Sequence, residues 1–185
     1  MALTKTPVCD FGKKAEDFKL KSIENKIISL NDVKGEKATL IMFICNHCPY
    51  VKAIVRDLAK DCNELKKDGI NSVAIMSNDT KNYPEDSFDN MIKFAKTNNF
   101  GEINYLIDET QEIARKYGAV CTPDFFGYNK ELKLQYRGRF RELKDLKPVL
   151  GGDSDLKIAM KMISETQAGP KEQIPSMGCN IKWFN

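Results

Sequence analysis

The chain has 185 residues, 42% of them apolar and 30% charged, a balance typical of a soluble globular protein and too apolar for a disordered chain. Its 29 basic and 26 acidic residues leave a net charge of only +3, so its electrostatics give no reason to expect nucleic acid or an anionic membrane as a partner. The length suits a single domain over residues 1–185 with a sizeable core.

The first predicted elements are a β-hairpin, a buried strand and a long helix. Apolar residues alternate with polar ones in residues 17–37, around the turn at 23–26, which is typical of two antiparallel strands. Residues 38–45 read ATLIMFIC, a continuous apolar run that suits a strand covered on both faces. From Pro49 the apolar residues recur at helical spacing until Gly69, so a helix should follow this strand directly.

The rest of the chain continues the alternation of strands and helices. We predict a buried strand at 70–77, a helix within 87–100, a short strand at 104–108, a short helix at 110–118, a hairpin of strands at 124–129 and 132–138, and a last helix within 153–169. Two βαβ units and an added hairpin predict an α/β fold with a central mixed β-sheet flanked by helices. Residues from 1 to about 36 would form an N-terminal β-hairpin extension, and those from about 168 to 185 an irregular C-terminal tail.

The sequence carries no sign of a membrane or export segment. Residues 1–20 lack the apolar stretch of a secretory signal, and the run at 38–45 is too short to cross a bilayer. We therefore expect a cytoplasmic protein, in which most of the six cysteines are kept as thiols.

Cys45 and Cys48 stand two residues apart where the predicted strand meets the predicted helix. Free N–H groups at the start of a helix stabilise a thiolate and lower its pKa below the ordinary value of about 8.5. The spacing allows the two sulfurs to close a disulfide, so one cysteine can attack a partner's disulfide and the other can resolve the mixed disulfide. His47, between them, would add a positive charge or a donor beside Cys45 and make the pair more oxidising. The pattern predicts a redox-active pair.

Three other interpretations of this pair remain open. A structural disulfide is unexpected in a reducing cytosol. A metal or haem site could use Cys45, His47 and Cys48, but structural zinc usually takes two such cysteine pairs, and the sequence has one pair and a single histidine. Two buried core thiols are the third alternative. The position at a strand-to-helix junction favours redox chemistry, with no cofactor beyond the cysteine pair itself.

Thr122 and Pro123 open an apolar strand, and together with the cysteine pair they carry a resemblance. A bond before proline is trans by default, since only about 5–6% are cis in folded proteins. The segments FICNHCPYV (43–51), CTPDFF (121–126) and PSMGCNIKW (175–183) nevertheless resemble the thioredoxin-like redoxin superfamily, in its alkyl-hydroperoxide-reductase/thiol-specific-antioxidant branch. The opening hairpin and residues 77–91 resemble the same branch, so the similarity spans nearly the whole chain.

The resemblance implies a thioredoxin-like fold and the activity of a thiol–disulfide oxidoreductase. Cys45 would be the nucleophile and Cys48 the resolving cysteine. Thr122 and Pro123 would form a cis-proline loop that packs against the pair and offers a backbone edge to an extended substrate. The partners would be protein or small-molecule thiols and disulfides, with a thiol reductant to restore the pair.

One feature of the superfamily's peroxidases is missing. They place a threonine three residues, and a proline seven residues, before the cysteine that attacks peroxide. Counting back from Cys45 gives Met42 and Ala38, and counting back from Cys48 gives Cys45 and Ile41. Disulfide exchange is therefore favoured, and a thiol peroxidase is the alternative.

The remaining cysteines and a basic segment have simpler explanations. Cys121 either faces the pair and the substrate or is a small buried residue at a strand start. Cys62 falls on the apolar face of the first long helix, and Cys9 is a bystander in an N-terminal arm. Cys179 is expected to be structural, with trapping or relay of a disulfide as the other reading. The alternating arginines at 137, 139 and 141 predict a solvated strand end.

Overall fold

The structure is a computed structural model that describes residues 3–7 and 10–184. Its centre is a seven-stranded mixed sheet with the order β3-β2-β6-β5-β4-β8-β9. The strands of this sheet are β2 (Lys19–Ser22), β3 (Ile27–Ser29), β4 (Ala38–Phe43), β5 (Ile70–Met76), β6 (Asn104–Ile107), β8 (Asp124–Asn129) and β9 (Leu134–Tyr136). The β2–β3 hairpin, the central strands and the β8–β9 hairpin all lie where the sequence predicts them.

Strand β4 is the centre of the sheet. It pairs in parallel with β5 and antiparallel with β8, and all six of its residues are buried. Successive side chains of a strand point to opposite faces. Leu40 and Met42 accordingly join one core cluster, and Ile41 and Phe43 join the other. A strand with a core on both faces must be apolar throughout, which explains its unbroken run of apolar residues.

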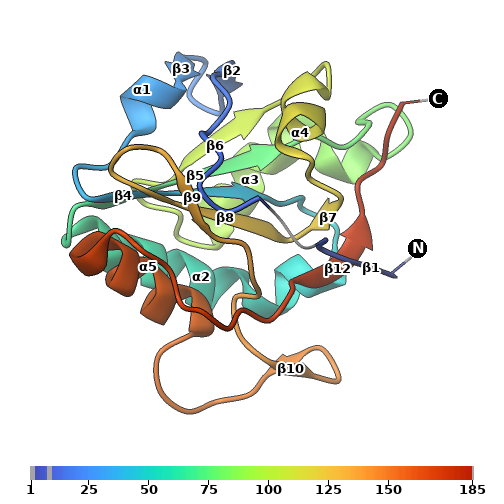
Figure 1. Ribbon diagram of the computed structural model, residues 1–185. Helices are drawn as coiled ribbons and strands as arrows, with labels where there is room; N and C mark the ends of the chain where they lie inside the picture. Colours follow the sequence, from blue (N-terminus) through green and yellow to red (C-terminus); the bar gives the residue numbers. More distant parts are fainter. Residues whose placement is uncertain (1–2, 8–9, 185) are drawn as a thin grey trace.

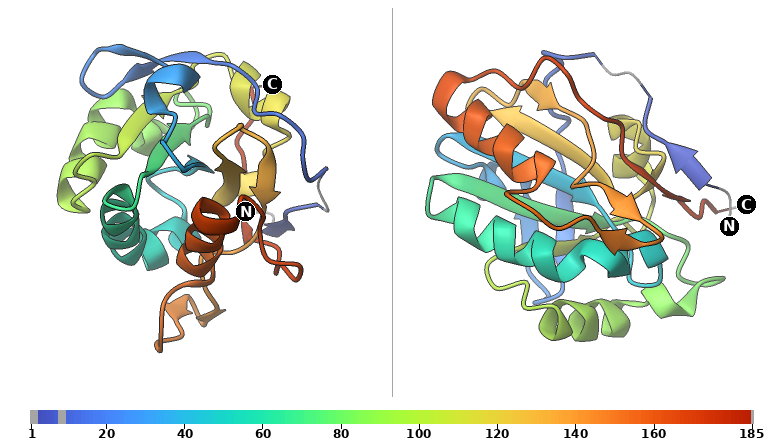
Figure 2. Two further views of the ribbon diagram at one scale, coloured as in Figure 1. Left: turned by 60° about the vertical axis from the view of Figure 1, so that its left-hand side comes forward. Right: turned by 90° about the horizontal axis from the view of Figure 1, so that it is seen from below.

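Helices cover both faces of the sheet (Figures 1 and 2). The helices α2 (Pro49–Lys66), α3 (Phe88–Thr97) and α5 (Asp155–Thr166) contribute to the core cluster on one face. The short helices α1 (Leu30–Val33) and α4 (Glu112–Tyr117) contribute to the cluster on the other. No helix within the described ranges combines the length and the apolar character needed to cross a membrane.

The C-terminal tail contains a strand, which the sequence analysis did not predict. Strand β12 (Met177–Asn180) lies between β1 (Leu3–Lys5) and β7 (Cys121–Thr122), so both ends of the chain meet beside the cis-proline loop (Figure 1). Gly178 permits this close approach, because a Cβ there would lie 2.0 Å from the carbonyl oxygen of Thr122. Strand β12 could not be predicted from the sequence, because its four residues are too few to show alternation and its partner strands are distant along the chain. A second small hairpin, β10 (Leu143–Lys144) with β11 (Lys147–Pro148), and a single 3₁₀ turn, η1 (Pro84–Asp86), were also missed.

Arg137 is buried, so the prediction of a solvated strand end is wrong at this position. Its guanidinium Nη2 lies 2.9 Å from Oδ2 of Asp124, whose side chain is fully buried, and it also donates to the carbonyl of Gly118. The same guanidinium lies over the ring of Phe126. Strand β9 ends at Tyr136, so the alternation of the arginines no longer places them on one strand face. The ion pair fixes the start of β8, directly after Pro123.

We expect Arg137→Met to destabilise the protein by about 3–5 kcal/mol near neutral pH, because it leaves the buried Asp124 carboxylate without its partner. The matched control is Lys116→Met, which breaks the exposed i,i+4 pair with Glu112 and should cost far less stability, because water screens this pair. Chemical denaturation of both variants measures the difference. Equal losses in the two variants would contradict the structural role given to the buried pair.

Candidate active site

Cys48 occupies the N-terminus of helix α2. Strand β4 ends at Phe43, and the chain crosses over to the helix with Cys48 as its N-cap residue and Pro49 in the first turn. Proline is favoured there, because its missing N–H would have no partner inside the helix. The backbone N–H of Val51, in the same first turn, donates a hydrogen bond to the sulfur of Cys48. The junction predicted from the sequence thus places Cys48, rather than Cys45, on the electropositive end of the helix.

Three sulfur atoms and Thr122 form one buried cluster. Cys45 Sγ lies 3.3 Å from the hydroxyl of Thr122, and Cys48 Sγ lies 3.1 Å from the carbonyl oxygen of the same residue. The sulfur of Cys179, from strand β12, is 3.2 Å from Cys48 Sγ. The exposed fractions of Cys45, Cys48 and Cys179 are only 1%, 0% and 4%. One residue of the cis-proline loop therefore contacts both members of the CxxC pair, and the tail contacts the second.

The two cysteines of the pair differ in acidity. The Cys45 thiol donates a hydrogen bond to the Cys48 sulfur, and this bond lowers the pKa of Cys48 to about 5, with further help from the N–H of Val51 and from Cys179. The same bond raises the pKa of Cys45, as do burial and the negative charge of Asp86. The helix N-terminus acts on Cys48, and the roles of Cys45 as nucleophile and Cys48 as resolving cysteine stay predictions.

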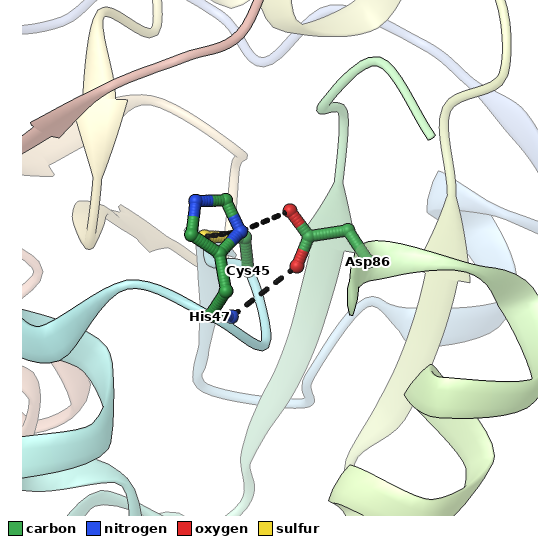
Figure 3. Close-up of side chains that lie close together, drawn as sticks. All are labelled: Cys45, His47 and Asp86. Atoms are coloured by element: carbon green, nitrogen blue, oxygen red, sulfur yellow. Dashed lines mark hydrogen bonds and ion pairs between the residues drawn. The ribbon is translucent and has the colours of Figure 1, made fainter. Parts of the chain in front are cut away.

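His47 is held by a carboxylate, and its ring also lies beside the sulfur of Cys45. Its Nδ1 lies 2.7 Å from Oδ2 of Asp86, but 3.9 Å from Cys45 Sγ (Figure 3). The Asp86 side chain is fully buried, while that of His47 is 12% exposed. The hydrogen bond with Asp86 raises the pKa of His47 above its ordinary value of 6.5. Because Nδ1 is engaged and Asp86 supplies the opposite charge, the imidazolium does not lower the pKa of Cys45.

Asp86 belongs to a polar network that the sequence analysis did not identify. Besides His47, it accepts hydrogen bonds from the backbone N–H of Asn46 and from the side chain of Asn78. The hydroxyl of Tyr105 in turn donates to Asn46. The position of Asn78 at the C-terminal end of β5 was a signal for this network, since sites of α/β proteins often lie there. The other members come from separate elements and have no local pattern.

The structure groups a different set of possible metal ligands from the set Cys45, His47 and Cys48 that the sequence suggests. Potential ligand atoms of Cys45, His47 and Asp86 lie within 4.8 Å of one another, and these are the residues drawn in Figure 3. Cys48 is not among them, and its sulfur contacts Thr122 and Cys179. Thiolate, imidazole and carboxylate groups all suit zinc. A cation would have to replace the direct His47–Asp86 hydrogen bond, and both Asp86 oxygens already accept other bonds.

The loop that carries Thr122 and Pro123 lies against the cysteine pair, and the bond between these two residues is cis. Pro123 lines a cavity of ≈ 240 Å³ together with Tyr50 from the start of α2, Arg139, and Met177 from the tail. This cavity is the open space next to the site, and its wall is mixed apolar and basic.

Cys121 is not part of the surface beside the site. Its side chain is fully buried, and its Sγ donates to the carbonyl of Pro123 at 3.5 Å, within its own loop. Burial raises its pKa, so it remains a neutral thiol. This burial agrees with the reading of Cys121 as a small buried residue, and its assignment to substrate binding stays a prediction. Cys62 is a core residue of α2, as predicted, and Cys9 lies outside the described residues.

Comparison with known proteins gives a family and a fold. The family model described as the AhpC/TSA family matches residues 11–139. A solved structure of an uncharacterized conserved protein from Geobacillus kaustophilus is 39% identical, with a TM-score of 0.94 over 100% of this chain and 97% of the other. A hypothetical protein from Sinorhizobium meliloti is 36% identical, with a TM-score of 0.90 over 98% of both chains. A search of curated proteins found no match.

More distant structures share the fold. A thiol:disulfide interchange protein of the thioredoxin family from Chlorobium tepidum has a TM-score of 0.62 at 18% identity, covering 85% of this chain and 99% of its own. The fold is therefore thioredoxin-like, as the resemblance implies, with a mixed sheet and flanking helices.

We expect the thiolate of Cys48 to form with a midpoint near pH 5, and to be lost as the pH falls through that value. Cys45→Ala should raise the midpoint, because it removes the donor to the Cys48 sulfur, while Cys45→Ser should hold it low because a hydroxyl still donates. Ultraviolet absorbance of the thiolate during a pH titration measures all three proteins. A midpoint near about 8.5, the value for an unperturbed thiol, would contradict this account.

His47 offers a second titration, and it is the only histidine in the sequence. We expect its NMR midpoint to lie above 6.5 in the wild type, because Asp86 stabilises the charged ring. The variant Asp86→Asn should shift the midpoint downward, since burial without the carboxylate favours the neutral ring. An unchanged midpoint would show that the Asp86 contact does not govern the charge of His47.

Proposed function

The chain belongs to the AhpC/TSA family, and on this premise we propose that it is a thiol–disulfide oxidoreductase that exchanges disulfides through Cys45 and Cys48. The observation that carries the proposal is that Thr122 contacts the sulfurs of both Cys45 and Cys48. Cys48 is the N-cap residue of α2, so this contact lies at the N-terminus of that helix. This arrangement combines a stabilised thiolate, a second sulfur hydrogen-bonded to it, and a loop whose proline lines the adjacent cavity. The thiol–disulfide interchange proteins among the structural neighbours share the fold and are consistent with this activity.

In the proposed reaction, Cys48 attacks and Cys45 resolves. The Cys48 thiolate attacks one sulfur of a substrate disulfide, a new S–S bond joins Cys48 to that half of the substrate, and the other half leaves as a thiolate that takes up a proton. Cys45 then gives up its proton and attacks Cys48 Sγ, which releases the second substrate thiol. Two cysteine thiols are oxidised and one substrate disulfide is reduced. A thiol reductant reverses these steps to restore the pair.

This order of attack differs from the one that the resemblance implies, and the physical reason is the position of the charge. A thiolate is the nucleophile in disulfide exchange, and the lower pKa belongs to Cys48. Loss of negative charge from Cys48 on forming the mixed disulfide removes the main influence that raises the pKa of Cys45. The resolving thiol thus becomes easier to deprotonate at the step in which it is needed.

A substrate reaches these sulfurs only if the covering segments move, because both cysteines are almost fully buried. The cavity lined by Pro123 adjoins the loop that contacts both sulfurs, and its wall includes Met177 of the tail strand. We propose that a thiol or disulfide substrate, from a protein or a small molecule, enters along this side. The pair itself is the redox group in this proposal, and no other cofactor takes part.

A thiol peroxidase is the second candidate, and family membership is the observation that favours it. Against it, the positions where such peroxidases carry threonine and proline hold Met42 and Ala38 when counted from Cys45. Counted from Cys48 they hold Cys45 and Ile41, and all of these residues are buried. The hydroxyl that contacts Cys45 comes from Thr122 instead. The site therefore lacks the side chains that shape a peroxide pocket, and disulfide exchange is the better supported function.

We expect the reduced protein to release thiols from glutathione disulfide and to lose this activity in Cys48→Ser. Cys45→Ser should retain the release of the first substrate thiol, because Cys48 alone performs the attack. Cys62→Ala is the matched control, since it removes a buried thiol of the same helix that lies outside the site. Release by Cys48→Ser but not by Cys45→Ser would restore the order implied by the resemblance.

The same preparation separates the alternative functions. Oxidation of the protein by hydrogen peroxide at a rate far above that of free glutathione would favour a peroxidase. Stoichiometric metal that is retained through purification and lost in His47→Ala would favour a metal carrier. Under the proposed function, neither result is expected.

A further inference from the structure

We propose that Cys179 is a third redox thiol of this site, which attacks Cys48 Sγ and forms a Cys48–Cys179 disulfide. The inference rests on the proposed function, because the substrate disulfide supplies the oxidising equivalents. It goes beyond the CxxC pair by giving the C-terminal tail a chemical step.

The first support is the distance between the two sulfurs. Cys48 Sγ and Cys179 Sγ are 3.2 Å apart, and a disulfide bond is about 2.05 Å long, so the sulfurs must approach by little more than about 1 Å. Such a shift is within the reach of side-chain rotation. Cys48 is thus the central sulfur of three, with Cys45 and Cys179 each hydrogen-bonded to it.

The second support is the way in which the fold holds the tail. Strand β12 pairs with β7, and Cys179 is the direct partner of Thr122 in this ladder. The carbonyl of Thr122 also contacts Cys48 Sγ, so one residue sets the positions of both sulfurs. Gly178, beside Cys179, has no side chain to keep the tail away from Thr122. The position of Cys179 is therefore fixed by backbone pairing on the strand next to the cysteine pair.

The third support is the electrostatic change that accompanies the reaction. Burial and the neighbouring Cys48 raise the pKa of Cys179 to about 12 in the reduced protein, and Lys182 acts in the opposite direction. Once Cys48 is bonded to a substrate sulfur, its negative charge and its hydrogen bond no longer oppose ionisation of Cys179. Cys45 and Cys179 therefore respond alike to the formation of the mixed disulfide on Cys48.

The step balances without another reactant. In the mixed disulfide between Cys48 and substrate, Cys179 loses its proton and attacks Cys48 Sγ, the Cys48–Cys179 bond forms, and the substrate leaves as a thiol that takes up the proton. Two thiols, Cys48 and Cys179, are oxidised for one substrate disulfide reduced. Cys45, still a thiol, can then attack Cys48 and release Cys179, which exchanges the two internal disulfides with no net oxidation.

The experiment follows the second substrate thiol in the Cys45→Ser protein, in which Cys179 is the thiol of the described residues that lies against Cys48 and can resolve the mixed disulfide. With glutathione disulfide, we expect Cys45→Ser to release both glutathione thiols and to yield a Cys48–Cys179 linked peptide by mass spectrometry. The double variant Cys45→Ser/Cys179→Ala should release only the first and keep glutathione bound to Cys48. Cys45→Ser/Cys62→Ala is the matched control and should behave as Cys45→Ser does. Thermal unfolding of each reduced variant checks that the tail substitution leaves the fold intact.

The Cys48–Cys179 bond must be found in the wild type or in Cys45→Ser. Its absence from both, under conditions in which the wild type forms a Cys45–Cys48 bond, would overturn the inference while leaving the proposed function in place. A second experiment uses diamide, which oxidises neighbouring thiols directly. It distinguishes failure of the Cys48–Cys179 pairing from failure of the proposed disulfide-exchange activity. If diamide yields the Cys48–Cys179 linked peptide but the protein does not react with glutathione disulfide, the thiol pairing is supported and the proposed function is rejected. If diamide yields no such peptide, the pairing is rejected.

Discussion

Thr122 is the constraint on which the geometry of the site depends. Its hydroxyl contacts one cysteine of the pair, its carbonyl contacts the other, and its backbone pairs with Cys179 of the tail. Three parts of the chain that are distant in sequence meet at this residue: the junction of β4 and α2, the loop before β8, and strand β12. The buried ion pair of Asp124 and Arg137 fixes the first residue of β8 and so restrains the loop that precedes this strand. Without this loop, the three sulfurs would have no common neighbour.

The chemistry of the site follows from the placement of charge within a buried space. The helix N-terminus, the N–H of Val51 and two thiols all favour negative charge on one sulfur, that of Cys48. The carboxylate of Asp86 is close enough to disfavour it on Cys45. His47 pairs with Asp86 at 2.7 Å, and the same Nδ1 lies 3.9 Å from the sulfur of Cys45. The result is a pair in which one cysteine is ionised and the other is neutral, which is the asymmetry that a stepwise disulfide exchange requires.

Family membership indicates the fold of this chain, but the side chains of the site distinguish between the possible activities. Members of a fold family can perform different reactions, so the argument for function has to come from the side chains. Here the strand that leads to the cysteines is apolar along its whole length, and the side chains that would shape a peroxide pocket are replaced by buried core residues. The space beside Pro123 is lined in part by Met177 of the tail.

Local patterns in the sequence predicted the sheet, the main helices and the cysteine pair at a strand-to-helix junction. These features depend on local apolar periodicity and on residues close together in the chain, such as the unbroken run of β4 and the helical spacing after Pro49. Tertiary contacts were needed to reveal that Asp86 binds His47, that Arg137 is buried against Asp124, and that Cys179 lies beside Cys48. The same contacts set the relative acidity of Cys45 and Cys48. Each of these depends on a contact between segments far apart in sequence, where distance and burial set the energy of a charge and no local pattern records them.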